Sequence, residues 1–505
     1  MSAWMKPLGW HWFSCCEARK ARALWWAATP VFLDVILDQS DFLLQFKRRE
    51  QQGRLRTLIT TVKSRQMQHA PEEFELEVDP EGVEVRPAPL VRQSGSGDLK
   101  PVPISLFLHA ETKNHQEHNQ RMVEGVRAII SPKAEILTQS RRFDPNLLAM
   151  SEFSAVDELQ IFQIDEFQLP TARSCSESPS ILYSFDAAAN SSLLEGRLPK
   201  LCAMVSLPGS QRLIAIPFYA NLSFFALRKP LVEAALRELG LDAWPGSWIE
   251  LAALCKKWEA LNPDPQKIFF SSPIYEHSVE TLNCLFFEIL YTYRPPTGAD
   301  HDDLSLWLDR PEALDAAVCF RTLCRRSYLR SKNKQPQLPA LITRHWYNTL
   351  NEELWETAGE EVEIEVKPLF DDVSTAGEWY LAIPAHSAAP DIGLRLIDFL
   401  TQSDRETTRA ELGVGLPTHT KYYESEQASI SRYFRFSRAN VRRLLEKAFR
   451  RSDFYRYQRA SGTVSSHLEW LLEIGADPGA GKEIGRAMDS LVESVRFIVR
   501  SERAG

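Results

Sequence analysis

The chain has 505 residues, which suggests roughly two to four domains at the usual size of about 100–200 residues each. Hydrophobic residues make up 44% and charged residues 25%, the composition of an ordinary globular protein with sizeable cores. The formal charge of −8 disfavours a dedicated nucleic-acid binder, which usually carries a basic surface. The sequence holds no apolar run of 18 residues, so it predicts no membrane span.

The apolar residues of residues 1–32 follow no clear helical or strand period, and the segment only loosely resembles a signal peptide. The basic cluster Arg19–Arg22 comes late, and the apolar run after it meets Asp34 without a small-residue cleavage site. The eight cysteines show no zinc-ligand spacing, which indicates free and mostly buried thiols in a reducing compartment. We therefore expect a cytoplasmic protein, with a periplasmic location as the alternative.

Residues 33–88 predict a small β-rich segment. Asp79–Gly82 supplies the turn chemistry of a hairpin between two alternating strands. The expected strands are Leu33–Leu37, Arg56–Lys63, Phe74–Val78 and Val83–Val85. Residues 89–100 then read as a linker rich in Pro, Ser and Gly.

From residue 101 strands and helices alternate, which predicts a parallel sheet with crossover helices. The first expected elements are a strand at Ile104–Leu108, a helix at Asn119–Ile130, and strands at Ala134–Leu137 and Leu159–Ile164. Asp165 and Glu166 follow the last of these strands, at the sheet edge where ligands gather. They either accept hydrogen bonds from ligand hydroxyls or form a solvated turn or helix cap.

The middle of the chain is predicted to be rich in helix. Ser247 is a candidate N-cap, with Glu250 completing a capping box. The expected elements are helices at Pro230–Leu239 and Ser247–Ala260, a strand at Leu341–Ile342 leading to Trp346 and Tyr347, a strand at Trp379–Pro384, and a helix at Ile392–Leu400.

Four stretches of residues 101–500 resemble bacterial extracellular solute-binding proteins of family 1, the sugar-type proteins that deliver substrates to ABC importers. They are Leu213–Tyr219 with Phe224–Lys229, Trp244–Leu251, Gly377–Pro384 with Ile397–Thr401, and Gly413–Thr418. Asn221–Ser223 and Arg228–Pro230 depart from the family pattern, which leaves the ligand open.

The resemblance implies an α/β fold of the two-lobed periplasmic-binding-protein type II class, with a hinge and the small β-rich segment before it. Lobe one would span about 101–216 and 383–425, lobe two about 220–380, and C-terminal helices 431–500. Such a protein closes over its ligand. The implied ligand is a small polar solute, above all a carbohydrate.

Sugar recognition combines carboxylates or amides for the hydroxyls with flat aromatic rings for the apolar faces. The candidate ligand-binding residues are Asp165, Glu166, Tyr219, Tyr275, Glu276, Trp346, Tyr347 and Trp379. The resemblance implies the cleft positions of Trp379 and of Tyr275 with Glu276, and Glu288 is a further candidate on a helix. Core packing is the alternative for the tryptophans, and hinge packing is the alternative for Tyr219.

The sequence holds no nucleophile, zinc-protease or phosphate-loop motif, so we expect no enzyme, no cofactor and no metal. His115 and His118 are predicted to lie on a helical surface rather than to bind a metal. The basic stretch Arg432–Arg459 is predicted to line the solvated side of a helix, and nucleic-acid or membrane binding is the less favoured reading.

Residues 33–88 resemble the last strands of KaiC-type RecA-fold ATPases. In that family a Lys-x-Arg pair reaches the phosphates of nucleotide held by a neighbouring subunit, and Lys63 and Arg65 match this pattern. Two hypotheses therefore stand. The first is a solute-binding module, for ABC-type uptake or cytoplasmic sensing, with an ABC importer or a RecA-type ATPase as partner. The second is a regulatory or interaction subunit of a RecA/KaiC-like ATPase assembly.

Overall fold

The structure is a computed structural model, in which the chain falls into two units. Unit one comprises Met1–Pro101 with Asp144–Val156, and unit two comprises Val102–Phe143 with Asp157–Gly505. The residues that the structure describes are 12–13, 23–24, 42–51, 54–64, 73–79, 82–87, 103–110, 113–130, 136–139, 158–174, 181–207, 209–272, 279–333, 340–350, 363–425, 429–431, 434–454, 457–475 and 479–501.

Unit one contains an antiparallel sheet with the strand order β3-β4-β5-β6. These strands are β3 (Phe42–Gln51), β4 (Arg54–Ser64), β5 (Glu73–Asp79) and β6 (Gly82–Pro87), and a separate pair joins β1 (Trp12–Phe13) to β2 (Ala23–Leu24). The predicted hairpin is confirmed, because Val78 pairs with Val83 and Asp79 with Gly82. The expected strand at Leu33–Leu37 and the linker at 89–100 lie outside the described residues.

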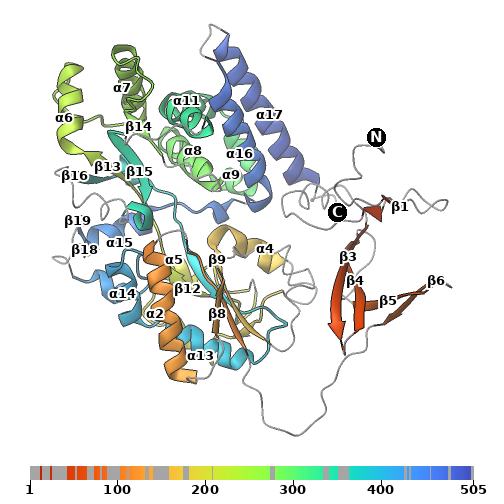
Figure 1. Cartoon of the computed structure of the whole chain (residues 1–505). Coiled ribbons are helices and arrows are strands. Elements are labelled where there is room, and N and C mark those ends of the chain that lie inside the picture. Colours follow the sequence, from red (N-terminus) through yellow and green to blue (C-terminus); the bar gives the residue numbers. More distant parts are fainter. Residues whose placement is uncertain are drawn as a thin grey trace. The chain divides into compact units, whose positions relative to one another are not determined.

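Lobe one of unit two is built on a sheet with the order β12-β17-β9-β7-β8. Its strands are β7 (Ile104–Phe107), β8 (Ile136–Gln139), β9 (Leu159–Asp165), β12 (Ile216–Tyr219) and β17 (Trp379–Ala382). β7 pairs in parallel with both β8 and β9, as predicted. Helices α2 (Lys113–Ile130) and α13 (Pro390–Leu400) pack on this sheet (Figure 1). Residues 379 and 380, assigned to lobe two from the sequence, belong here because β17 is antiparallel to β9 and β12.

Lobe two is built on a second sheet with the order β14-β15-β13-β16. Its strands are β13 (Ser223–Arg228), β14 (Phe270–Ser271), β15 (Ile342–Trp346) and β16 (Ile364–Pro368). Aromatic rings fill the core beneath it, where Phe225 contacts Trp248, Phe270 and Phe370. The β-branched and aromatic composition of these short strands suits a sheet that is buried on its inner face.

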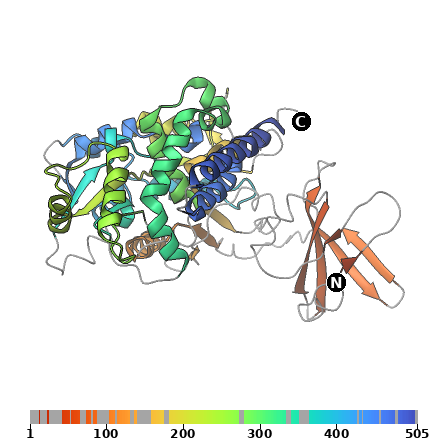
Figure 2. The same ribbon diagram turned by 90° about the horizontal axis from the view of Figure 1, so that it is seen from above.

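Helices cover the sheet of lobe two and include the C-terminal pair, which packs along α8 and α11 (Figure 2). They are α6 (Lys229–Glu238), α7 (Trp248–Leu261), α8 (Val279–Tyr293), α9 (Gly298–Asp302), α10 (Leu304–Leu308), α11 (Pro311–Lys332), α16 (Tyr457–Glu473) and α17 (Ala480–Ser501). Among the described helices, none is long and apolar enough to cross a membrane.

The predicted N-cap of α7 is confirmed, but the capping box is not. The Ser247 hydroxyl accepts a hydrogen bond from the backbone N–H of Glu250 at 3.2 Å. The Glu250 carboxylate accepts from the N–H of Gly246 at 2.7 Å, one residue before the cap. The carboxylate still satisfies an N–H beside the helix start, so the local role is similar.

A second core joins the short C-terminal elements to the sheet of lobe two and to the connecting residues Ala220 and Leu222. Leu198, Leu416 and Leu445 pack there with Phe224 and Tyr347. The remaining elements are α4 (Leu169–Ser174), β10 (Phe185–Asp186), α5 (Pro199–Cys202), β11 (Arg212–Leu213), α14 (Ser403–Glu411), β18 (Ser429–Ser431), β19 (Phe434–Ser437), α15 (Arg438–Lys447), and the 3₁₀ turns η3 (Glu166–Gln168), η5 (Ser191–Leu193), η7 (Phe370–Asp372), η8 (Thr420–Tyr423) and η9 (Arg451–Asp453).

Three described segments, residues 219–223, 374–378 and 448–451, connect the lobes or lead from the second core into lobe two. Main-chain bonds tie them together: Gly377 N to Asn221 O at 3.0 Å, Ala376 N to Phe449 O at 2.8 Å, and Phe449 N to Ser374 O at 3.1 Å. These hydrogen bonds give partners to buried backbone groups that an extended crossing segment would otherwise leave unpaired. The C-terminal segment is therefore part of the hinge region and not an appended tail.

The turn at Gly413–Thr418 supports the first of these segments, and Gly415 is required there. A Cβ atom at Gly415 would lie 2.6 Å from Cγ of the buried Tyr219. We expect Gly415→Ala to lower the free energy of unfolding by about 1–3 kcal/mol, because the ring must move in a packed core. Urea denaturation of the full chain measures this change.

Gly462→Ala is the matched control, since Gly462 lies in α16 and has no atom within 4 Å of an added Cβ. It should raise stability by about 0.5–1 kcal/mol, because alanine favours the helix. Equal effects of the two substitutions would contradict the packing argument.

Candidate functional site

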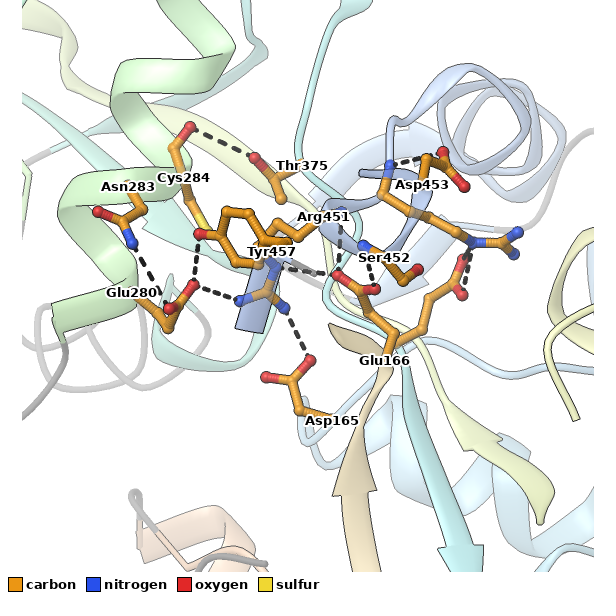
Figure 3. Close-up of polar contacts among 12 residues, drawn as sticks. Asp165, Glu166, Glu280, Asn283, Cys284, Thr375, Arg451, Ser452, Asp453 and Tyr457 are labelled. Carbon is orange, nitrogen blue, oxygen red and sulfur yellow. Dashed lines mark hydrogen bonds and ion pairs between the residues drawn. The ribbon is translucent and has the colours of Figure 1, made fainter. Parts of the chain in front are cut away.

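A buried arginine holds carboxylates from both lobes. The Arg451 guanidinium donates to Asp165 Oδ1 at 2.7 Å, to Glu166 Oε1 at 2.9 Å and to Glu280 Oε2 at 3.0 Å. Asp165 and Glu166 lie at the end of β9 in lobe one, whereas Glu280 begins α8 in lobe two (Figure 3). We call these four residues the Arg451 clasp. It links the two lobes through a single side chain of the C-terminal segment.

The backbone and a tyrosine complete the clasp. The N–H groups of Arg451 and Ser452 donate to the Glu166 carboxylate at 3.2 and 3.0 Å. The Tyr457 hydroxyl donates to Glu280 Oε2 at 2.8 Å (Figure 3). Glu166 is fully buried, so these donors replace the water that its charge would otherwise need. Its carboxylate is engaged within the protein, and its predicted ligand contact stays a prediction.

The buried position of Arg451 corrects one expectation. Arg450 and Arg451 were predicted to line a solvated helix side, but both are at most 5% exposed. The reason is that α15 ends at Lys447, so Arg450 lies in the extended stretch after this helix and Arg451 begins the 3₁₀ turn η9. Residues after a helix end no longer follow its solvated face.

Two further buried ion pairs line the same region. Arg450 Nε donates to both oxygens of Glu378 at 2.9 and 2.8 Å, and the Tyr380 hydroxyl donates to Glu378 Oε2 at 2.8 Å. Burial raises the pKa of the Glu378 carboxyl, and Arg450 opposes that shift. Arg344 pairs with Glu288 at 2.7 Å, and this carboxylate also accepts from the N–H of Thr375. Glu288 thus anchors a connecting segment in lobe two.

Beside the clasp, three aromatic side chains gather at the carboxyl edge of the lobe-one sheet. Trp379 is half-buried and pairs in register with Asp165. His109, just after β7, stacks on Trp379 with ring centroids 4.8 Å apart. Tyr219, at the end of β12, lies 6.1 Å from the same tryptophan ring. We call His109, Tyr219 and Trp379 the aromatic platform.

Amide groups hold the platform in place. The Gln163 side chain donates to the Tyr219 hydroxyl at 2.8 Å and accepts from the His109 N–H at 3.0 Å. Tyr219 is only 1% exposed, so its ring supports the platform from below. The half-buried rings of His109 and Trp379 retain accessible surface. Fixed amide partners of this kind pre-organise a binding surface.

Trp346 is the corresponding half-buried aromatic residue of lobe two. It ends β15, and the Arg344 guanidinium lies 4.4 Å from the centroid of its ring. A Cβ atom at Gly377 would lie 3.2 Å from its Cζ3 atom, so a larger residue there would crowd the tryptophan ring. Trp346 therefore packs partly against the hinge region.

The other predicted site residues have varied positions. Tyr347 is fully buried in the second core, where its hydroxyl donates to the Ala410 carbonyl at 2.8 Å. Tyr275, Glu276 and Arg65 lie outside the described residues, and Lys63 lies on β4. The sequence analysis did not identify His109, although it follows the predicted strand Ile104–Leu108 at the same sheet edge as Asp165.

His115 and His118 are buried, which corrects the predicted surface position. They lie on the inner face of α2, and His118 Nε2 accepts from Arg409 Nε at 3.3 Å. Burial and the nearby Arg409 guanidinium hold the pKa of His118 well below its ordinary value. Within the described ranges, no group of three His, Cys, Asp or Glu residues could hold a metal ion.

Comparison with known proteins identifies the fold. No family model matches the sequence, and no curated protein sequence does. Solved structures similar to this chain include maltose-bound MalE3 of T. maritima, with 17% identity, a TM-score of 0.57 and coverage of 78% of this chain and 99% of that chain. UgpB of Mycobacterium tuberculosis in complex with glycerophosphocholine gives 15% identity and a TM-score of 0.57. The match covers 81% of this chain and 100% of that chain.

An ABC transporter solute-binding protein of Thermotoga lettingae, bound with α-D-tagatose, gives 15% identity and a TM-score of 0.56. It covers 79% of this chain and 100% of that chain. At such low identity the likeness concerns the fold. It confirms the predicted two-lobed α/β fold.

The clasp predicts a large loss of stability when its cation is removed. We expect Arg451→Met to lower the free energy of unfolding by about 3–5 kcal/mol, because it leaves buried carboxylates without a partner. Urea denaturation checks this value. The control Arg442→Met removes a surface ion pair with Glu446 and should lower the free energy of unfolding by less than about 0.5 kcal/mol. Similar losses for the two variants would show that the clasp is not a buried network.

The buried His118 predicts a pH-dependent stability. In the unfolded chain this histidine binds a proton below a pH of about 6.5, whereas the folded protein keeps it neutral. The unfolded state then binds more protons, so stability falls by about 1.4 kcal/mol per pH unit below that value until folded His118 is protonated. Unfolding curves of wild type and His118→Gln between pH 7.5 and pH 5, roughly spanning this range, measure the difference. Parallel pH profiles would contradict the assignment.

Proposed function

We propose that the protein binds a small polar solute, above all a carbohydrate, at the aromatic platform between its two lobes. The observation that carries this proposal is the stacked pair of half-buried rings, Trp379 and His109, at the carboxyl edge of the lobe-one sheet. Ligands of open α/β sheets gather at this edge. Flat aromatic rings suit the apolar faces of sugars.

Polar groups next to the platform would bind the hydroxyl groups of such a solute. Asp165 is the register partner of Trp379 and is half-buried, so a carboxylate lies beside the ring. Trp346 is proposed as the contact from lobe two. Glu166 and Tyr347 are fully buried and fit a supporting role better than direct contact. The protein would act by binding and closure, without chemistry of its own.

The solutes bound by the similar structures support a polar ligand. MalE3 binds maltose, the Thermotoga lettingae protein binds α-D-tagatose and UgpB binds glycerophosphocholine. Delivery to an ABC importer is the proposed context. The resembled solute-binding proteins are extracellular, which favours the periplasmic alternative over the cytoplasmic location expected from the sequence. The nucleotide contact of Lys63 and Arg65 stays a prediction, and none of the similar structures supports the ATPase-assembly alternative.

Thermal unfolding with maltose, α-D-tagatose and glycerophosphocholine tests the proposal. A bound solute at 100 times its Kd should stabilise the full chain by about 2.7 kcal/mol. We expect Trp379→Ala to weaken binding by about 10- to 100-fold, because it removes the stacking surface.

Trp470→Ala is the matched control, since Trp470 is an exposed tryptophan of α16, outside the platform. It should leave solute binding unchanged. Equal affinities of the two variants for a bound solute would contradict the platform. The absence of any stabilising solute in a broader sugar panel would contradict the proposed function itself.

A further inference from the structure

A cavity separate from the aromatic platform lies on the opposite side of the segment that leads into β17. Its volume is about 250 Å³. Its walls come from α5 in lobe one, from α15 and from the residue before Trp379. Three apolar and three polar residues carry the argument: Leu198, Leu201, Leu445, Lys200, Glu378 and Glu446. We call this cavity the Lys200 pocket.

Lys200 has an unusual set of partners. Its ammonium group donates to the main-chain carbonyls of Glu446, at 3.2 Å, and of Ala448. Among the residues that the structure describes, it forms no ion pair. An ammonium carries three N–H donors, so these two bonds leave one donor for a ligand. Burial, and then the nearby Arg450, lowers the pKa of Lys200, and the carboxylates of Glu378, Asp453 and Glu166 oppose that shift.

Arg450 adds a second cation behind the pocket wall. Its Nε atom is bound to Glu378, but its buried Nη2 group has no hydrogen-bond partner. The Glu378 carboxylate is therefore already matched by Arg450. The remaining carboxylate of the pocket, Glu446, is exposed and pairs with Arg442. Among the described residues that line the pocket, no carboxylate forms a direct ion pair with Lys200.

We propose that the Lys200 pocket binds a compact organic monoanion, with its carboxylate on Lys200 and its apolar body against Leu201 and Leu445. The volume is below the roughly 300–1,000 Å³ of sites for drug-sized ligands, so the body is small, such as one aromatic ring. A charge-assisted hydrogen bond inside a largely apolar cavity gives both affinity and selection for the charge.

This site is distinct from the aromatic platform. Glu378 and Tyr380 are hydrogen-bonded two residues apart, so both side chains lie on one side of the strand. Trp379 points to the opposite side. The proposed monoanion and the proposed solute therefore occupy different surfaces, and each is testable without the other.

Isothermal titration of the full chain with benzoate tests the proposal, with benzamide and benzylammonium as neutral and cationic analogues. We expect saturable one-to-one binding of benzoate and at least about tenfold weaker binding of both analogues. Lys200→Gln should weaken the binding of benzoate at least about tenfold. Lys200→Arg keeps the charge, so its affinity for benzoate should stay within about threefold of the wild-type value. Thermal unfolding without ligand confirms that each variant is folded.

Two controls complete the experiment. Lys229→Gln changes an exposed lysine of lobe two and should leave benzoate binding unchanged. Trp379→Ala should also bind benzoate normally, which separates this site from solute binding. Equal binding of benzamide and benzoate, unchanged affinity in Lys200→Gln, or no saturation by benzoate up to about 10 mM would overturn the proposal.

Discussion

The structure depends on how it accommodates one buried positive charge. A guanidinium removed from water needs several well-placed acceptors, because an unpaired buried charge costs far more than a surface pair returns. Arg451 finds them on two different lobes, in Asp165 and Glu166 on one side and Glu280 on the other. These carboxylates lie at the end of β9 and in the first turn of α8, and the C-terminal segment places Arg451 between them.

The aromatic platform takes its position from this arrangement. Trp379 pairs in register with Asp165, so the clasp and the platform share one edge of one sheet. The Glu378 carboxylate, adjacent in sequence, is held by Arg450 from the same C-terminal segment. A change in the separation of the lobes would therefore affect the buried ion pairs and the rings of the platform together.

Local patterns in the sequence predicted much of the fold, because their causes are local. Turn chemistry at Asp79–Gly82 and the hydroxyl of Ser247 each specify nearby backbone. The burial of Arg451, Tyr347 and His118 depends on partners far along the chain. Local patterns in one sequence do not predict such long-range contacts. The aromatic residue Trp379 was identified through a family resemblance, whereas His109 required the geometry of the sheet edge.

The clasp has one more consequence, which concerns its net charge. Three carboxylates face one guanidinium, so the formal charges of Asp165, Glu166, Glu280 and Arg451 sum to −2. This excess of negative charge lies beside Trp379, on the other side of the platform from the Arg409 guanidinium, which is 5.9 Å from the Tyr219 ring. At the proposed binding site it would disfavour a phosphorylated sugar beside Asp165 more than a neutral one, because like charges repel. The same side chains that hold the lobes together would thus also act as an electrostatic filter.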